Sequence, residues 1–434
     1  MILPVPHSVT RVRWRVVFAL FAIAAVSFLD RNNISIAATA IQQDFGLSNL
    51  QLGAVFSAFV AGYALAQPLA GRVADLFGPT RVIALGIVWW SALTAATALV
   101  PGGYAWSMGV LMAVRFLLGL GEAVIFPASN RMVGNWIPAS ERGLANGIIF
   151  AGVGVGAGIA PPLITAILIH ADWKSAFYVS AAIGVAMMAF WLMTVRDRPE
   201  QMAGVSPGEL RLIREGATAR AEVAPMGWGA ILGNRTLALL ALSYFTYGYV
   251  AYIFFTWFFK YLSGVRGLDL KSSGIYGMLP FLAMAIASPL GGFLADRLTA
   301  AKGARVGRCY TASAALAVAA IFVALATQVA DARLATLFLA GGAGALYMSQ
   351  SAFWTISANL GGRSAGSVSG VMNMANQIGG VVTASLTPWL ADSFGWTASF
   401  VFAACLSLLG ALAWLFINPN DQLDTSLLQD QTDA

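Results

Sequence analysis

Twelve long apolar segments follow one another along almost the whole chain. A helix needs about 20 consecutive, mostly apolar residues to cross the hydrocarbon core of a bilayer, and each segment has roughly that length. Backbone polar groups cannot stay unpaired in lipid, so each segment is expected to be helical. We therefore predict an all-α membrane protein with twelve transmembrane helices. The segments cover, within a few residues, 16–41, 50–74, 81–100, 105–128, 143–168, 173–195, 236–260, 272–295, 307–328, 334–357, 364–391 and 395–417.

The composition excludes several other classes of protein. Of the 434 residues, 59% are hydrophobic and 10% are charged, whereas soluble domains contain about 25% charged residues. The net charge of +6 does not indicate nucleic-acid binding, because the basic residues lie mainly in short loops, where they set membrane topology. We find no nucleotide-binding loop, nucleophile–base pair or metal-ligand spacing in the sequence. We expect neither enzymatic activity nor a cofactor.

Lysine and arginine residues alternate between crowded and sparse loops. The loops on one side carry eighteen of them, including six arginines in residues 196–235, and the loops on the other side carry five. Because cytoplasmic loops are enriched in Lys and Arg, we expect both termini to be cytoplasmic. We also expect a monomeric, multi-pass protein of the cell (inner) membrane.

The two halves of the chain repeat each other, and residues 196–235 form the one long polar stretch between them. At an offset of 221 residues, the stretch Pro68-Leu-Ala-Gly71-Arg-Val-Ala-Asp75 returns as Pro289-Leu-Gly-Gly292-Phe-Leu-Ala-Asp296. Transporters built from repeats bind substrate near the midplane, between the repeated units. We predict an N-terminal six-helix bundle at 1–195, a cytoplasmic linker at 196–235, a C-terminal six-helix bundle at 236–418 and a cytoplasmic tail at 419–434.

Four ionisable residues lie inside apolar segments: Asp30, Arg31, Arg115 and Glu122. A charge near the middle of a membrane costs at least a few kcal/mol on insertion scales, so such residues are candidates for a functional site. Seven residues make nearly two helical turns, so Arg115 and Glu122 lie on one helical face. Two acids and two bases form a formally neutral set, which favours burial. The alternative is that the four residues only lock helices together as two ion pairs.

The loop after the second segment carries a further motif, Gly71-Arg-Val-Ala-Asp75-Leu-Phe-Gly78-Pro-Thr-Arg81. Gly71 permits close helix approach, and Asp75 can accept hydrogen bonds from a helix N-terminus or pair with an arginine. A plain tight turn is the alternative interpretation. The motif and its place make the chain resemble the major facilitator superfamily. The partial second copy ends at Asp296-Arg297, which makes a gating role for Asp296 less certain than for Asp75.

Three further stretches narrow the resemblance to the anion:cation symporter family, which includes bacterial galactonate, glucarate and hexuronate transporters and sialin-like vesicular carriers. The resemblance implies that Arg31 contacts the substrate anion and that Glu122 takes part in proton coupling. It matches Asp30 and Arg115 to a second acid and its partner. Arginine stays charged and binds carboxylate through two parallel hydrogen bonds. The stretches are Phe28-Leu-Asp30-Arg31-Asn32-Asn33, Arg115…Glu122 and Phe126-Pro127-Ala-Ser-Asn130-Arg131.

Other polar or aromatic residues are candidates for the substrate site. Tyr63 and Asn373 match substrate-facing residues of the resembled family, although packing is an open alternative for Tyr63. Ser351 and Trp354 are expected either to line the C-terminal wall of the site or to pack in the core. Asn376 and Gln377 are interpreted as cavity or helix-contact residues. Four tyrosines of the seventh segment are interpreted mainly as core or interfacial residues: Tyr244, Tyr247, Tyr249 and Tyr252.

Two positions depart from the pattern of the sugar-acid members. Val153 stands where those members carry a Gln, and Phe353 stands where they carry a small hydroxyl residue. Both differences remove hydrogen-bonding capacity that a polyol would use. They favour a less hydroxylated anion.

We therefore predict a proton-coupled symporter that takes up a small organic anion by alternating access. A sugar acid (hexonate, hexarate or hexuronate) is the first expectation. In the hypothesis, protonation of Glu122 frees Arg31 to bind the substrate carboxylate, while Asp30 holds Arg115. One alternative is a uniporter or exchanger of an aromatic or short hydroxy carboxylate. The other is a non-transporting membrane sensor.

Overall fold

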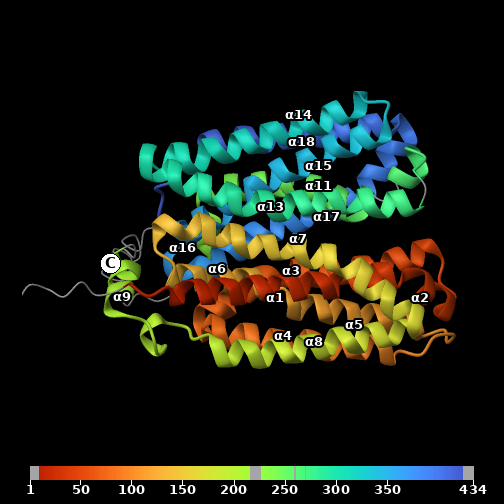
Figure 1. Ribbon diagram of the computed structural model, residues 1–434, viewed down its shortest axis with the longest axis horizontal. Helices are drawn as coiled ribbons and strands as arrows, with labels where there is room; N and C mark the ends of the chain where they lie inside the picture. Colours follow the sequence, from red (N-terminus) through yellow and green to blue (C-terminus); the bar gives the residue numbers. More distant parts are fainter. Residues whose placement is uncertain (1–8, 216–225, 259–260, 269, 424–434) are drawn as a thin grey trace, which may run out of the picture.

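The structure is a computed structural model that describes residues 9–215, 226–258, 261–268 and 270–423 (Figure 1). Part of the predicted linker (216–225) and most of the predicted tail (424–434) lie outside these residues. The longer helices are α1 (Val12–Ile36), α3 (Asn49–Phe77), α4 (Pro79–Leu99), α5 (Ser107–Glu122), α6 (Ile125–Trp136), α7 (Arg142–His170), α8 (Trp173–Thr194), α11 (Arg235–Thr256), α13 (Leu270–Lys302), α14 (Thr311–Gln328), α15 (Ala332–Met348), α16 (Gln350–Gly361), α17 (Ala365–Phe394) and α18 (Trp396–Phe416).

Shorter helical elements connect them. They are α2 (Ala38–Phe45), η1 (Ala139–Glu141), η2 (Pro199–Gln201), α9 (Pro207–Glu215), α10 (Trp228–Leu232), η3 (Tyr261–Val265), η4 (Arg305–Tyr310) and η5 (Gly362–Ser364). The part of the chain described here contains no β-strand, which confirms the predicted all-α class. The expected fourth segment is divided into α5 and α6 around Ala123 and Val124.

Among the described residues, ten helices are long and apolar enough to cross a membrane. At the two other expected spans, the structure has either two short helices or a helix that is more polar than the ten. One span is broken at Ser349 into α15 and α16, so neither piece alone has the length of a bilayer. The other span is α17, which is long but carries Asn373, Asn376 and Gln377 in its middle.

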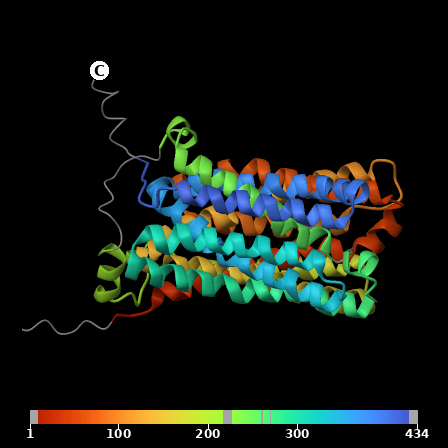
Figure 2. The same cartoon turned by 90° about the horizontal axis from the view of Figure 1, so that it is seen from above.

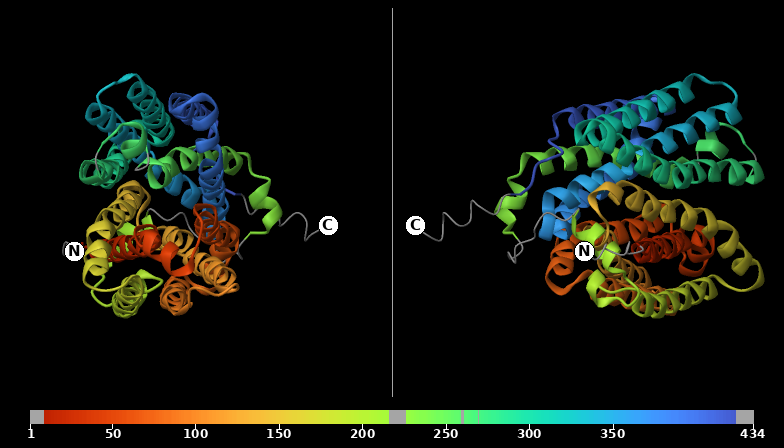
Figure 3. Two further views of the ribbon diagram at one scale, coloured as in Figure 1. Left: turned by 90° about the vertical axis from the view of Figure 1, so that its right-hand side faces the viewer. Right: turned by 60° about the vertical axis from the view of Figure 1, so that its left-hand side comes forward.

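The helices gather in two groups, α1–α8 and α11–α18, which separate clearly when the molecule is viewed from one end (Figure 3). Within the first group, α1 packs on α7, α3 on α5, and α4 on α8. Within the second group, α11 packs on α17, α13 on α15, and α14 on α18. The two groups meet where α7 packs on α13 and α3 packs on α17. The boundaries expected for the two bundles, 1–195 and 236–418, stay a prediction.

One end of the molecule carries the linker helix α9, the start of α1 and the end of α18 (Figures 1 and 2). We call it the linker end. Here the buried Glu209 of α9 accepts hydrogen bonds from the backbone N–H groups of Val12 and Arg13, at 3.1 and 3.0 Å. The hydroxyl of Thr10 and the guanidinium of Arg13 also donate to Glu209, at 2.6 and 3.0 Å. Arg13 further pairs with Glu141, so one cluster ties α1 and η1 to the linker.

Burial alone would raise the pKa of Glu209, but the hydrogen bonds from Thr10, the backbone of α1 and Arg13 outweigh it. The pKa of Glu209 therefore lies below its ordinary value. A carboxyl with a lowered folded-state pKa stabilises the fold above the unfolded-state pKa. That contribution is lost as the pH falls through the folded-state pKa.

Two pairs of glycines let the groups touch backbone to backbone. A Cβ atom at Gly71 of α3 would overlap the carbonyl oxygen of Gly366 in α17. In the second repeat, a Cβ atom at Gly292 of α13 would overlap the carbonyl oxygen of Gly143 in α7. The repeated glycines of the sequence therefore sit at equivalent contacts between the two groups.

Gly71→Ala is expected to destabilise this arrangement by about 1–3 kcal/mol, because the added methyl group overlaps backbone that cannot rotate away. Gly158→Ala is the matched control, since nothing lies within 4 Å of its Cβ position in α7. Thermal unfolding of both variants in detergent tests this. A melting temperature lowered equally in both variants would contradict the close contact.

Glu209→Gln should lower the melting temperature at pH 7, and the difference from the wild type should shrink as the pH falls below about 4, because the unfolded state protonates first and the folded state follows at its lowered pKa. The control is Glu200→Gln, because Glu200 forms an exposed pair with Arg214 on the same linker. Exposed pairs contribute little to stability. A pH-independent difference for Glu209→Gln would contradict the role of the carboxylate charge.

Candidate functional site

A cavity of about 170 Å³ lies between the two helix groups. It extends from Tyr244 and Gln350, near the middle of the molecule, towards Ser35 and Thr256, close to the ends of α1 and α11 that are remote from the linker end. Aromatic side chains make up much of its wall. Those that line it are Phe28, Phe56, Phe59, Tyr63, Phe126, Phe150, Tyr244, Tyr247, Tyr252, Phe255 and Tyr347.

Arg31 of α1 lines this cavity, and aromatic rings surround its guanidinium. The guanidinium carbon lies 4.5 Å from the ring centroids of Phe28 and Tyr63 and 5.1 Å from that of Phe59. Such cation–π contacts stabilise a charge without using its N–H groups. Nε and Nη2 of Arg31 are buried without a hydrogen-bond partner. The side chain is therefore positioned to donate to a ligand.

Glu122, at the end of α5, is the acid closest to Arg31. Its Oε1 lies 3.4 Å from Nη2 of Arg31 and accepts a hydrogen bond from the hydroxyl of Ser27. Its Oε2 is buried and has no hydrogen-bond partner. The ion pair is therefore loose, and Oε2 accepts no hydrogen bond from the described residues.

Asp30 and Arg115 do not form the direct pair expected from the sequence. Asp30 is buried and accepts a hydrogen bond of 2.7 Å from the hydroxyl of Thr94 in α4. Arg115 is also buried, and its guanidinium carbon lies 4.9 Å from the ring centroid of Phe59. Within the described chain no ion pair of 4.0 Å or less joins Asp30 to Arg115. The hydroxyl of Thr94, and not the guanidinium of Arg115, binds the carboxylate of Asp30.

Tyr63 and Asn373 line the cavity, as the sequence predicts. The hydroxyl of Tyr63 is buried without a hydrogen-bond partner. The amide of Asn373 in α17 donates to Oε1 of Gln67 in α3 at 2.9 Å, and the amide of Gln67 donates to the carbonyl of Ala123 at 3.1 Å. Gln67 was not singled out from the sequence, although its polar side chain within an apolar segment is the signal that could have found it.

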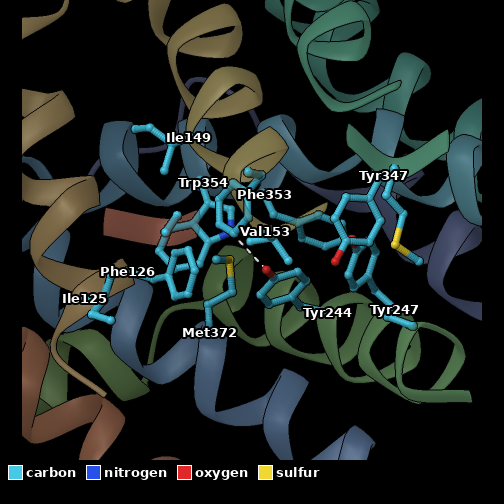
Figure 4. Packing of buried hydrophobic residues seen from close by; sticks show 14 of the residues in the cluster. Ile125, Phe126, Ile149, Val153, Tyr244, Tyr247, Tyr347, Phe353, Trp354 and Met372 are labelled. Atoms are coloured by element: carbon cyan, nitrogen blue, oxygen red, sulfur yellow. Dashed lines mark hydrogen bonds between the residues drawn. The ribbon is translucent and has the colours of Figure 1, made fainter. Parts of the chain in front are cut away.

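Ser351 and Trp354 of α16 are not among the residues that line the cavity, so packing in the core is the one of the two expected placements that this structure shows. Both are buried in the core. The indole of Trp354 donates to the hydroxyl of Tyr244 at 2.9 Å, and its ring packs on Phe126 and Phe150 (Figure 4). A new helix, α16, begins after the break at Ser349, and it packs on α6 and α7.

Val153 and Phe353, the two positions that depart from the pattern of the sugar-acid members, have different surroundings. Val153 lines the cavity. Phe353 is fully buried and packs against Tyr244, Tyr247 and Trp414 (Figure 4), so it removes no hydrogen-bonding group from the cavity wall. The inference drawn from Phe353 was wrong, because a single sequence does not reveal which face of α16 meets the cavity.

The tyrosines of α11 were interpreted mainly as core residues, but three of them line the cavity: Tyr244, Tyr247 and Tyr252. Tyr252 donates to Gln377 of α17 at 2.5 Å. Tyr249 is buried elsewhere, within 3.1 Å of the hydroxyl of Thr387. Tyr247 and Tyr249 point to nearly opposite sides because they are two residues apart on a helix. Helical spacing could therefore have separated Tyr249 from Tyr247.

At the linker end, Asp75 binds the start of a helix in the other group. Its carboxylate accepts hydrogen bonds from the backbone N–H groups of Gly366 and Ser367 at the start of α17, at 3.0 and 2.8 Å. Its Oδ1 lies 3.7 Å from Nε of Arg131. A helix N-terminus favours a negative charge. Arg81 is exposed and does not pair with Asp75.

Asp296 makes the equivalent contact in the second repeat. It accepts hydrogen bonds from the N–H groups of Gly143 and Leu144 at the start of α7, at 3.0 and 2.6 Å, and pairs with Arg308. The sequence left a role for Asp296 less certain because the motif stops after Arg297. The backbone of α7 supplies the contacts that the motif cannot reveal.

Asp75 and Asp296 thus join α3 to α17 and α13 to α7. Further hydrogen bonds link the groups near the same end, from Asn130 to Ser357 and from Asn146 to Thr355. These contacts close the linker end. The cavity lies beyond them.

The fold and the site define a polytopic membrane protein with a charged cavity between two repeated helix groups. The Major Facilitator Superfamily matches residues 20–384 and 303–431. The solved structure of the proton:xylose symporter XylE superposes with a TM-score of 0.76, at 16% identity, over 96% of this chain and 99% of that one. The chain belongs to the Major Facilitator Superfamily.

Three curated relatives narrow the comparison. A probable sulfoacetate transporter of Cupriavidus necator is 34% identical over 91% of each chain. A hexuronate transporter of Bacillus subtilis is 29% identical over 93% of this chain and 94% of its own. A probable L-galactonate transporter of Escherichia coli is 26% identical over 94% of this chain and 90% of its own. Each of these three relatives is named as a transporter.

Asp296→Asn should open the linker end, because the neutral amide leaves Arg308 unpaired and weakens two bonds to α7. Cys309 follows Arg308 and is buried, with its Sγ bonded to the carbonyl of Ile417, so its reaction with a maleimide reports the loosening of η4 beside Arg308. In a Cys405→Ser background we expect labelling about tenfold faster than without the substitution. Asp172→Asn is the control, since Asp172 caps α8 at an exposed site. Equal labelling rates in both variants would contradict a role of Asp296 in closing the linker end.

Proposed function

We propose that the protein takes up a small organic anion across the cell (inner) membrane together with protons, by alternating access. The observation that carries the proposal is Arg31, a buried guanidinium in the cavity with two unpartnered nitrogens beside the buried acid Glu122. A charged residue in a membrane cavity is a functional candidate. The anions in the names of the three relatives support the proposal.

Proton coupling follows from the competition between Glu122 and the substrate for Arg31. With both acids ionised, Asp30, Arg31, Arg115 and Glu122 carry no net charge. A bound monoanion would leave one uncompensated negative charge in a low-dielectric site, which is costly. Protonation of Glu122 removes that charge and releases Arg31. Substrate and proton therefore favour the same loaded state, and each acts through its different affinity for the two states.

The direction of access follows from the closed linker end. The excess of Lys and Arg in its loops makes this end cytoplasmic. The cavity would then receive substrate and protons from outside. Movement inward requires the bonds of Asp75 and Asp296 to the opposite helix group to break, because they hold the cytoplasmic ends together.

Sugar acids (hexonates, hexarates or hexuronates) are the first candidate substrates. The similarity to the hexuronate transporter and to the probable L-galactonate transporter supports them. Polar residues that line the cavity, such as Asn32 and Asn376, support them as well. A second candidate, an exchanger of an aromatic or short hydroxy carboxylate, is favoured by Val153 and the aromatic wall. Tight binding of galactonate without any response to aromatic acids would exclude the second candidate.

The proposal is tested with purified protein in liposomes. An inward proton gradient should drive accumulation of a radiolabelled anion chosen from a thermal-shift screen of sugar acids, aromatic acids and dicarboxylates. Accumulation that is independent of the gradient would contradict proton coupling.

Arg31→Ala should abolish anion binding, and Arg31→Lys should weaken it by about ten- to hundredfold, because lysine lacks the two-pronged geometry. Arg333→Lys, at an exposed arginine, is the control and should bind like the wild type. Binding is measured by calorimetry. Wild-type affinity in Arg31→Ala would exclude Arg31 as the anion contact.

A further inference from the structure

We propose that the cavity is built for an anion with two negatively charged groups, one bound by Arg31 and the other by Arg115. This inference rests on the proposed function, because it assumes that the cavity binds the transported anion. It goes further than the proposed function by specifying that the substrate carries two negative charges and that Arg115 contacts the substrate directly. The sequence had assigned Arg115 only to Asp30.

Both arginines line the cavity, whereas neither Asp30 nor Glu122 is part of its lining. Arg115 is 2% exposed, and its Nε is buried without a hydrogen-bond partner. It makes no ion pair of 4.0 Å or less among the residues that the structure describes. A buried and unpaired guanidinium is costly, and a bound anion would satisfy it.

The two arginines are close enough for one small molecule to reach both. Their guanidinium carbons lie 5.1 and 4.9 Å from the ring centroid of Phe59, so they are at most 10.0 Å apart. Each charge-assisted hydrogen bond from an arginine to an anionic oxygen spans about 2.7–2.9 Å. A short chain with a charged group at each end fits between them.

The acids that face these arginines are partly engaged elsewhere. Asp30 accepts from Thr94, and Glu122 accepts from Ser27. Among the described residues, Glu122 is the one acid within ion-pair distance of Arg31, at 3.4 Å. When both Glu122 and Asp30 are protonated, the two arginines carry two positive charges, which a dianion compensates in full. A monoanion would compensate one of them and would leave the guanidinium of Arg115 without a hydrogen-bond acceptor.

The chemical class is therefore a compact dianion, such as a dicarboxylate, a sulfocarboxylate or a hexarate. The cavity of about 170 Å³ limits its size. Phe59 contacts both arginines and lines the cavity, so it offers an apolar surface to the chain that connects the two charged groups. Hydroxyl groups on that chain can reach Tyr63 or Asn376, each of which has a buried oxygen without a hydrogen-bond partner.

The test compares matched ligands by calorimetry on the purified, full-length protein. Each pair differs in the charge of one end group: succinate and succinamate, sulfoacetate and its carboxamide, galactarate and galactonate. The wild type should bind the dianion of at least one pair about ten- to hundredfold more tightly than the monoanion. Arg115→Met should remove most of that preference while changing monoanion affinity little. Arg115→Lys should retain part of it, since it keeps the charge.

Monoanion binding by Arg115→Met also shows that the variant is folded. Equal affinities within every pair in the wild type would overturn the inference and leave anion transport standing, as would an unchanged preference in Arg115→Met. The proposed function itself fails if neither class of anion binds, or if Arg31→Met binds all six ligands like the wild type.

Discussion

The loose contact between Arg31 and Glu122 is the interaction on which the rest of this structure depends. The two opposite charges lie 3.4 Å apart within the first helix group, and two nitrogens of Arg31 and one oxygen of Glu122 accept or donate no hydrogen bond among the described residues. A tight and fully satisfied pair would compete with the substrate anion for Arg31. A loose pair can be replaced by a substrate anion and a proton at small net cost, because each charge keeps a partner.

The remainder of the fold allows the two groups to move around that contact. Asp75 and Asp296 occupy equivalent positions in the two repeats, and each holds the N-terminus of a helix in the other group. Because these contacts consist of hydrogen bonds between backbone and carboxylate, they can break without exposing a large apolar surface. The glycine contacts at Gly71 and Gly292 bring the backbones of the two groups close together in this closed arrangement.

The sequence predicted much of the fold and part of the site. The length of the apolar segments predicted the long helices, and repeated glycine and aspartate residues predicted two equivalent halves. Three of the four membrane charges are buried, the side chain of Arg31 is 14% exposed, and both arginines line the cavity. Partners could not be predicted, since Thr94 and not Arg115 binds Asp30. Nor could the orientation of α16, which turns Ser351 and Trp354 into the core, because it depends on the break at Ser349.

The most direct measurement of the central claim uses Glu122→Gln in liposomes, because glutamine mimics the protonated acid permanently. If Glu122 is the carboxyl that competes with substrate for Arg31, the variant should still bind substrate and exchange it across the membrane in a counterflow assay. It should lose accumulation driven by an inward proton gradient, because it has no proton to release. Accumulation against a substrate gradient at the wild-type rate would contradict this account and would leave Asp30 as the coupling acid.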